Sequence, residues 1–249
     1  MLEPEESRYF DALDAAFERT LAPYRSAGAP LTLLYSGGVD SSLLAWELRS
    51  RTGLVLLTVG TPESPDLAAG RSGAELLGLP WTPAVVNAAD ADRMVRAIAD
   101  DLRGTRAVTR TVLLALALAI ERCPTPQALV GQGADELFLG YAHFRGLDRE
   151  QATARAEADL ARLHEEDWPH TLEIAARLGH TVTAPFLDAD YVAVARSVPI
   201  ELRLPGGEPK RFFRDWALRR GLPEEIAARP KRAMQYGSGV DRLRRRRPA

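Results

Sequence analysis

The stretch LTLLYSGGVDSS, residues 31–42, decides the fold class of this chain. Its mostly apolar start predicts a buried strand over residues 31–35, and the residues after it predict a helix over 40–50. The loop between them therefore lies where a strand passes into a helix N-terminus. Gly37 and Gly38 let the backbone approach a ligand closely, and the free N–H groups of a helix end attract an anion. The pattern favours a phosphate-binding loop over an ordinary glycine-rich turn.

Two common nucleotide-binding motifs do not account for this loop. The GxxxxGK[ST] motif needs a Gly-Lys pair, which the chain lacks, and the loop contains no GxGxxG pattern. The loop is therefore a phosphate site of another kind.

The composition is that of a globular protein, with 249 residues, 46% hydrophobic and 27% charged. A net charge of −2 gives no reason to expect a nucleic-acid-binding protein. Cys123 is the single cysteine, so no intrachain disulfide can form and nothing indicates an oxidising compartment. The longest apolar run, residues 112–120, is well short of the ~20 residues that cross a bilayer. Because the sequence opens without a basic and apolar leader, we expect a cytoplasmic protein.

Arginine carries almost all of the positive charge. Among 32 basic residues only Lys210 and Lys231 are lysines. A retained lysine indicates a place where a compact point charge is needed. The arginine-rich run 242–247 predicts a solvated tail, with a binding arm as the alternative.

Strand and helix patterns alternate along the first part of the chain. We expect strands at 31–35, 54–59, 83–86 and 127–130, and helices at 5–20, 40–50, 66–77 (capped by Asp66), 90–102 and 109–122. This alternation predicts an α/β protein with a parallel doubly wound sheet, which binds ligands at the carboxyl ends of its strands.

Beyond residue 140 the pattern becomes helical. We expect helices at 148–166, 168–178, 188–197, 209–220 and 223–228, with no clear strand. The predicted organisation is one domain, with an α/β part over 1–145, a helical C-terminal part over 146–240 and a basic tail over 241–249.

A second glycine-containing loop, GQGADELFLGY at 131–141, follows the expected strand 127–130. It places Asp135 at the same sheet edge as Asp40. Two carboxylates near phosphates are what a Mg²⁺ site needs. Taken alone, Asp135 and Glu136 would favour a helix start, where acidic residues interact with the dipole, but beside Asp40 the metal site is favoured.

Five motifs, in order, resemble the synthetase domain of asparagine synthetase and its relative β-lactam synthetase, members of the PP-loop (N-type ATP pyrophosphatase) family. They are SGGVDSS at 36–42, TVGTPESPDLAAGRSGAELLG at 58–78, GQGADELFLGY at 131–141, APFLD at 184–188 and RPKRAMQYGSGV at 229–240. The resemblance covers residues 5–240 and implies an adenine nucleotide alpha hydrolase-like fold. It also implies a two-step reaction. ATP adenylates a substrate carboxylate and releases pyrophosphate, and a nitrogen nucleophile then displaces AMP to form an amide.

The resemblance also implies roles for individual residues. The residues that would hold pyrophosphate and Mg²⁺ are Ser36, Gly37, Gly38, Asp40, Ser41, Ser42, Gly131 and Gly133, with Asp135 completing the metal site. Val59 and Gly60 would meet the adenine through backbone groups. Lys231 would place a preorganised cation against the phosphates, the alternative being a surface cation. Lys210 opens a predicted helix and is interpreted as structural.

Three departures from the family concern the second half of the reaction. The chain opens at Met1 without the glutaminase domain and its N-terminal cysteine, so we expect ammonia, another amine or a separate glutaminase as the nitrogen source. Gln132 stands where the family has a glutamate that deprotonates the nitrogen, and an amide cannot act as a base. Either the nucleophile arrives neutral, or another carboxylate such as Glu136 acts, or the product is not asparagine. Thr183 stands where the family often has an arginine, which indicates a substrate other than aspartate.

The leading hypothesis is an AMP-forming ligase that uses ATP, Mg²⁺ and a small-molecule carboxylate. One alternative is a PP-loop enzyme that activates a carbonyl for sulfur or amine transfer, for example on tRNA, and a lone Cys123 beside Pro124 disfavours it. The other is a non-catalytic nucleotide-binding protein, which Asp40, Asp135 and Lys231 disfavour. The acid and the oligomeric state, for which a homodimer is one option, stay open.

Overall fold

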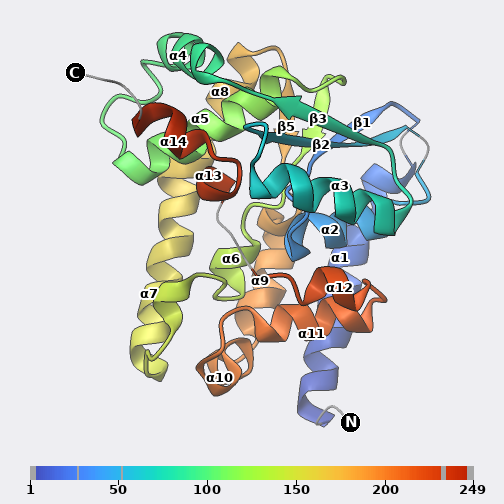
Figure 1. Ribbon diagram of the computed structural model, residues 1–249. Helices are drawn as coiled ribbons and strands as arrows, with labels where there is room; N and C mark the ends of the chain where they lie inside the picture. The colour runs from blue at the N-terminus through green and yellow to red at the C-terminus, as the bar shows by residue number, and fades with distance from the viewer. Residues whose placement is uncertain (1–3, 27, 52, 231–233, 246–249) are drawn as a thin grey trace.

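The computed structural model describes residues 4–26, 28–51, 53–230 and 234–245 and contains a five-stranded parallel sheet of order β3-β2-β1-β4-β5 (Figure 1). The strands are β1 (Leu31–Leu34), β2 (Leu54–Gly60), β3 (Trp81–Val85), β4 (Gln127–Leu129) and β5 (Thr181–Thr183). The larger helices are α1 (Pro4–Ser26), α2 (Val39–Glu47), α3 (Pro65–Leu77), α4 (Ala88–Ala97), α5 (Ala107–Glu121), α7 (Arg149–Arg162), α8 (Trp168–Arg177), α9 (Ala189–Ser197) and α11 (Arg211–Arg219). The predicted parallel doubly wound sheet is confirmed.

Shorter helical segments connect these elements. They are α6 (Ala134–Leu137), α10 (Ile200–Arg203), α12 (Glu224–Ala227), α13 (Met234–Gly237) and α14 (Val240–Arg245), together with 3-10 turns over Ala142–Phe144, Pro185–Leu187 and Pro205–Gly207. A π-helical turn, Leu163–Asp167, joins α7 to α8. The single helix predicted over 148–166 is therefore α7 followed by this turn.

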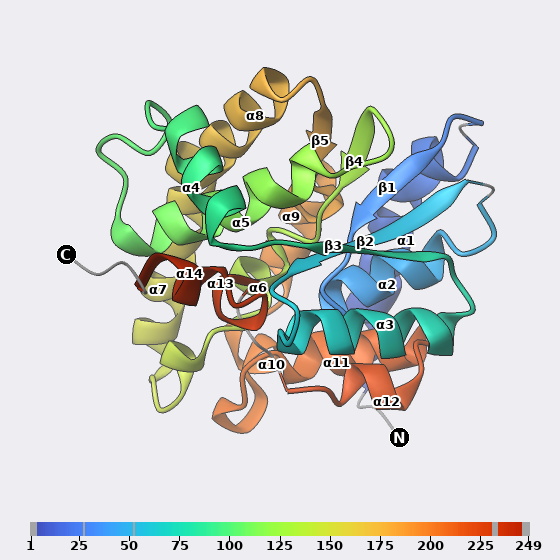
Figure 2. The ribbon, with the colours of Figure 1, turned by 45° about the horizontal axis from the view of Figure 1, so that its top comes forward.

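The sheet has a hydrophobic core on each face because successive strand residues point to opposite sides. Leu31, Leu33 and Tyr35 face a core shared with α1, α2, α9 and α11, whereas Leu34 faces a core shared with α4, α5 and α8. Figure 2 shows α3 on one side of β2 and β3, with α4 and α5 on the other. Both faces of the sheet are covered, which leaves the strand ends as the place for a ligand.

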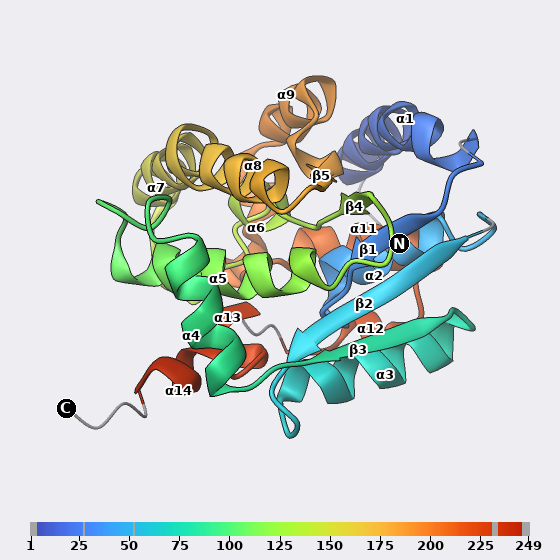
Figure 3. The same cartoon turned by 90° about the horizontal axis from the view of Figure 1, so that it is seen from above.

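The C-terminal helices pack against α1, the first helix of the chain. In Figure 3, α7, α8, α9 and α1 follow one another along one side of the molecule. The aromatic ring of Phe17 on α1 contacts Phe186, Tyr191 and Trp216, with ring centroids 5.2–5.6 Å apart. The leading helix is therefore part of the same core as the C-terminal helices, and it runs to Ser26, beyond the predicted 5–20.

One strand in the C-terminal part contradicts the prediction of an all-helical region. β5 pairs in parallel with β4 and forms an edge of the sheet. Its three residues, Thr-Val-Thr, are too few to show an alternating pattern, and helices precede and follow it. The prediction was wrong because edge strands this short carry little sequence signal.

The start of α3 differs in detail from the prediction. Ser64, not Asp66, is its N-cap, and the Ser64 hydroxyl accepts a hydrogen bond from the Leu67 N–H at 3.4 Å. Pro65 takes the first helical position, where its missing N–H costs nothing. Asp66 instead lies in the first turn and is buried.

In the part of the chain that the structure describes, no helix combines the length and the apolar character needed to cross a membrane. Cys123 is buried, and burial raises the pKa of its thiol to about 12. The thiolate form that sulfur chemistry requires is therefore strongly disfavoured.

Candidate active site at the strand ends

The loops that follow β1 and β4 lie together, as the strand ends predict. The two strands are parallel neighbours, with Leu33 paired to Leu129. A Cβ placed on Gly131 would lie 3.3 Å from the Cβ of Asp40, so the second loop runs directly against the start of α2. This close approach brings the side chains of both loops to one place.

Local hydrogen bonds shape the loop between β1 and α2. The Ser36 N–H donates to the Ser41 hydroxyl, and the Gly38 N–H donates to the Ser36 hydroxyl, each at 3.3 Å. Gly37 has a φ of +72°, and a Cβ there would come within 2.5 Å of the Ala69 backbone. Only glycine fits this position without a shift of the chain.

The predicted loop residues do not all face the same way. Ser36, Asp40 and Ser41 line a pocket, together with the second loop. Ser42 is fully buried, and its hydroxyl is 3.0 Å from the hydroxyl of Tyr35. The Ser42 side chain therefore belongs to the core beneath the loop.

Lys210 joins the two carboxylates that the sequence predicts as metal ligands. Its Nζ lies 2.5 Å from Asp40 Oδ1 and 2.5 Å from Asp135 Oδ1. The lysine is 1% exposed, whereas the two carboxylates are partly exposed, so a buried cation joins two carboxylates at the edge of the pocket. Burial has the largest influence and lowers the pKa of Lys210, and the Asp40 carboxylate opposes that lowering. Sequence reasoning missed this role, although the scarcity of lysine was a signal for it.

The backbone around Lys210 is adapted to this position. Lys210 precedes α11 and has a φ of +66°, which is uncommon for a residue with a side chain. Its Nζ lies 5.0 Å from the ring centroid of Phe213, one turn along the helix. At Gly140, a Cβ would fall 1.9 Å from Asp135 Oδ1 and 2.8 Å from Lys210 Cδ, so the chain passes tightly over the cluster.

The two carboxylates also suit a divalent cation, because both already face a single positive charge. Within the described ranges, no group of three or more His, Cys, Asp or Glu side chains is placed to hold a metal ion. Phosphate oxygens and water would have to complete the coordination, as Mg²⁺ commonly requires.

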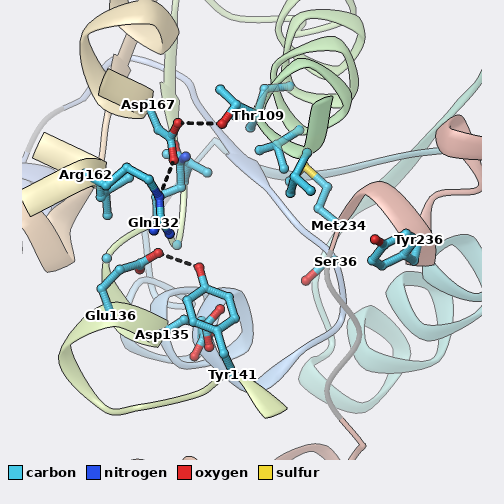
Figure 4. Close-up of a pocket in the computed structure, with 18 of the residues that line it drawn as sticks. Ser36, Thr109, Gln132, Asp135, Glu136, Tyr141, Arg162, Asp167, Met234 and Tyr236 are labelled. Carbon is cyan, nitrogen blue, oxygen red and sulfur yellow. Dashed lines mark hydrogen bonds and ion pairs between the residues drawn. The ribbon is translucent and has the colours of Figure 1, made fainter. Parts of the chain in front are cut away.

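A pocket of about 640 Å³ opens beside this cluster, between α5, α7 and the two loops (Figure 4). Gln132 and Gly133 of the second loop line it. The Oε1 atom of Gln132 is buried and makes no hydrogen bond. Gly133 has a φ of +98° and lies against Leu187, so the Pro-Phe-Leu-Asp segment supports this loop from behind.

Glu136 and Tyr141 form a buried acid pair in the pocket wall. The Tyr141 hydroxyl donates a hydrogen bond to Glu136 Oε1, as Figure 4 shows. Burial raises the pKa of Glu136, and the hydrogen bond from Tyr141 works against that rise. The pKa of Tyr141 lies well above its usual range because of burial and the adjacent carboxylate. Once ionised, Glu136 is a stronger proton acceptor than an exposed glutamate.

A second charged cluster lies on α7, at the far wall of the pocket. Asp159 is fully buried and accepts hydrogen bonds from Arg162 at 2.7 Å and from Arg155 at 3.2 Å. His143 Nε2 is 2.8 Å from the same carboxylate. Asp159 itself does not line the pocket, but the three groups that it holds do. Arg155 and Arg162 lie four and three residues from Asp159 along α7, a sequence signal that the prediction did not use.

Asp159→Asn should lower the free energy of unfolding by about 2 kcal/mol at pH 7, because two charge-assisted hydrogen bonds weaken. Burial acts against the charged form of Asp159, but the arginines outweigh it and hold the pKa below its ordinary value of 3.8. A lowered pKa stabilises the fold above the unfolded-state pKa. The advantage of the wild type over the variant should therefore fade as the pH falls below about 4. Urea unfolding between pH 3 and 7 measures this, and a difference independent of pH would contradict it.

The end of β2 lies on the other side of the first loop. Val59 lines a small recess with Ser36, Asp66 and Met234. Gly60 follows it, and a Cβ there would meet the Ser64 hydroxyl at 2.1 Å. This is the region predicted to meet adenine, and its backbone is closely packed.

The late segment after α12 folds back onto the first loop. Arg229 donates hydrogen bonds to the carbonyl oxygens of Gly37 at 3.1 Å and Ala69 at 2.7 Å. After the gap at 231–233, Met234 lines the pocket. Lys231 lies outside the described residues, so its predicted role against the phosphates stays a prediction.

Thr183 ends β5, and its carbonyl oxygen accepts a hydrogen bond from the Val130 N–H at 3.0 Å. The residue therefore ties the second loop to the sheet edge through its backbone. Its short side chain brings no charge to this edge.

A parallel doubly wound sheet, a glycine loop at a strand-to-helix junction and two carboxylates at adjacent strand ends define the class of α/β proteins that bind ligands at the carboxyl edge of the sheet. The chain matches the sequence profile of the family described as Asparagine synthase over residues 11–176 and 148–248, and it belongs to that family.

Individual proteins are similar to this chain at lower identity. The chain is 28% identical over 253 residues to the asparagine synthetase (glutamine-hydrolyzing) of Gallus gallus, covering 95% of this chain and 44% of that protein. It is 29% identical over 252 residues to asparagine synthetase (glutamine-hydrolyzing) 1 of Arabidopsis thaliana, covering 92% and 43%. It thus spans less than half the length of these relatives. The solved NH3-dependent NAD synthetase of Campylobacter jejuni is similar at 14% identity and a TM-score of 0.40, covering 97% of each chain.

Proposed function

We propose that this chain is an ATP-dependent carbon–nitrogen ligase that adenylates a carboxylate, releases pyrophosphate and transfers nitrogen to the activated acid. The observation that carries this proposal is the convergence of Asp40 and Asp135 on one point, 2.5 Å from Lys210 Nζ, at the edge of a 640 Å³ pocket. Membership of the asparagine synthase family supports the same reaction class.

Asp40 and Asp135 would hold Mg²⁺, which when bound neutralises charge on the phosphates of ATP. Ser36 and Ser41 would donate hydrogen bonds to phosphate oxygens from the first loop. Lys210 is already buried at this place and supplies a fixed positive charge where negative charge develops.

Nitrogen transfer needs a group that accepts a proton from the nucleophile. Gln132 cannot do this, because its amide is not basic. Glu136 lines the same pocket, is buried and is hydrogen-bonded by Tyr141, so it is the carboxylate best suited to the task. Ammonia or another amine would approach from the side of the pocket that these residues share.

The test is pyrophosphate release from ATP and Mg²⁺ with a panel of carboxylic acids and ammonium. We expect acid-dependent release, and Asp40→Asn should lower it about 100-fold, because the variant removes one of the two carboxylates that would hold Mg²⁺ against the phosphates. Asp100→Asn is the matched control, since that aspartate is 72% exposed and lies outside the pocket. Circular dichroism confirms that both variants fold. If no acid elicits pyrophosphate, or if Asp40→Asn retains full activity, the proposal is wrong.

A further inference from the structure

One wall of the pocket is apolar and belongs to α5. Val108, Val112 and Leu116 line the pocket and are spaced four residues apart, so they form one stripe along the helix. Leu116 is 1% exposed and joins the core, whereas Val108 is 59% exposed at the other end. The stripe therefore continues the hydrophobic core outward along the wall of the pocket.

Two exposed apolar side chains face this pocket. Among the described residues, six large hydrophobic side chains are exposed, and two of them, Val108 and Tyr236, line it. Leu163, at the end of α7, adds to the same lining. Apolar surface that faces a cavity favours a ligand that removes it from water.

A second wall offers hydrogen bonds, and its two arginines, Arg155 and Arg162, are both paired with Asp159. Gln132 Oε1 and Arg162 Nε are buried there and make no hydrogen bond. The charge of Arg162 is already balanced by Asp159 at 2.7 Å and by Asp167 at 3.9 Å, and Figure 4 shows it beside Gln132. A buried polar atom without a partner is unfavourable until a ligand supplies one. A ligand that brings a donor to Gln132 Oε1 and an acceptor to Arg162 Nε would complete this wall.

We propose that the acid activated in this site is amphipathic, with an apolar body that lies on the stripe of Val108 and Val112 and an N–H donor that reaches Gln132. The inference rests on the proposed ligase function and adds its substrate class. It distinguishes an apolar acid from a small dicarboxylate such as aspartate, and Thr183, which brings no cation to the sheet edge, agrees with it.

Three probe acids separate the parts of this proposal. Leucine carries the carboxylate, an isobutyl group and an N–H donor, 4-methylpentanoic acid lacks the donor, and aspartate replaces the apolar group by a charge. With ATP and Mg²⁺ present, we expect leucine to give the fastest pyrophosphate release and the largest rise in melting temperature. 4-Methylpentanoic acid should follow, and aspartate should be at least tenfold slower than leucine.

Val108→Asp should lower leucine-dependent release about tenfold, because it places a charge on the apolar stripe. The variant should fold, since Val108 is the second residue of α5, where an acidic residue is favourable. Val85→Asp is the control, because Val85 is 47% exposed on β3 and is not part of the pocket lining.

The outcomes separate the two proposals. If aspartate matches or exceeds leucine, or if Val108→Asp leaves the response to leucine unchanged, the amphipathic substrate is refuted while the ligase stands. If no acid releases pyrophosphate, the ligase is refuted, and the melting temperature decides the substrate class. A rise in melting temperature that is larger with leucine than with aspartate, and that Val108→Asp abolishes, supports the amphipathic substrate. The absence of such a rise overturns it.

Discussion

Lys210→Met should lower the free energy of unfolding by about 3 kcal/mol, because it leaves two carboxylates close together without their shared cation. Lys210 is 1% exposed and lies 2.5 Å from both Asp40 and Asp135, so it supplies the positive charge that both carboxylates face. Methionine is unbranched and nearly as long as lysine, and it carries no charge. Urea unfolding at pH 7 measures the loss.

Two comparisons identify the cause of that loss. In the double variant Lys210→Met with Asp135→Asn, one of the two carboxylates is gone, so part of the stability should return. Arg211→Met, at the neighbouring and 56% exposed side chain, should change stability by less than about 0.5 kcal/mol.

Magnesium gives a second readout for the same variant. Millimolar Mg²⁺ should raise the melting temperature of Lys210→Met more than that of the wild type, because the ion can take the place between the carboxylates. A variant as stable as the wild type, with no response to Mg²⁺, would show that the cluster is neither a structural ion pair nor a cation site.

The sequence was sufficient to place Asp40 and Asp135 together, because both follow strands whose carboxyl ends share one edge. It was insufficient for Lys210, which reaches the same point from a segment 75 residues beyond Asp135 and depends on how α11 packs. No local pattern encodes such a long-range contact. The only available signal was compositional, and it applied equally to Lys231.

The distinction between local sequence patterns and long-range packing also explains where the structure differs from the other predictions. β1 and β2 are buried and apolar, so their pattern is strong, whereas β5 has three residues and is defined only by its pairing with β4. The orientation of Ser42 into the core depends on the hydroxyl of Tyr35 beneath the loop. Motif similarity predicts which segment forms a loop, but the packing below it decides which side chains face the ligand.

Gly37→Ala should be among the most damaging single-methyl changes in this chain. At a φ of +72° a side chain costs roughly 1–2 kcal/mol. The added Cβ would also come within 2.5 Å of the Ala69 carbonyl group, which is backbone and cannot rotate away. Overpacking of this kind costs a further 1–3 kcal/mol, so we expect a loss of about 3 kcal/mol in the free energy of unfolding.

Gly104→Ala separates these two contributions. Gly104 has nearly the same φ, +78°, but a Cβ there would meet no atom within 4 Å. Gly104→Ala should therefore lower the free energy of unfolding only by the conformational cost of the positive φ, about 1 kcal/mol, and should keep full pyrophosphate release. In Gly37→Ala the loop must shift, and the Gly37 carbonyl would move relative to Arg229, which anchors the late segment 3.1 Å away. Pyrophosphate release should then fall by more than the unfolded fraction explains, as activity and urea unfolding measured on the same preparation would show. Equal losses of stability in the two variants would mean that the contact with Ala69 does not constrain the loop.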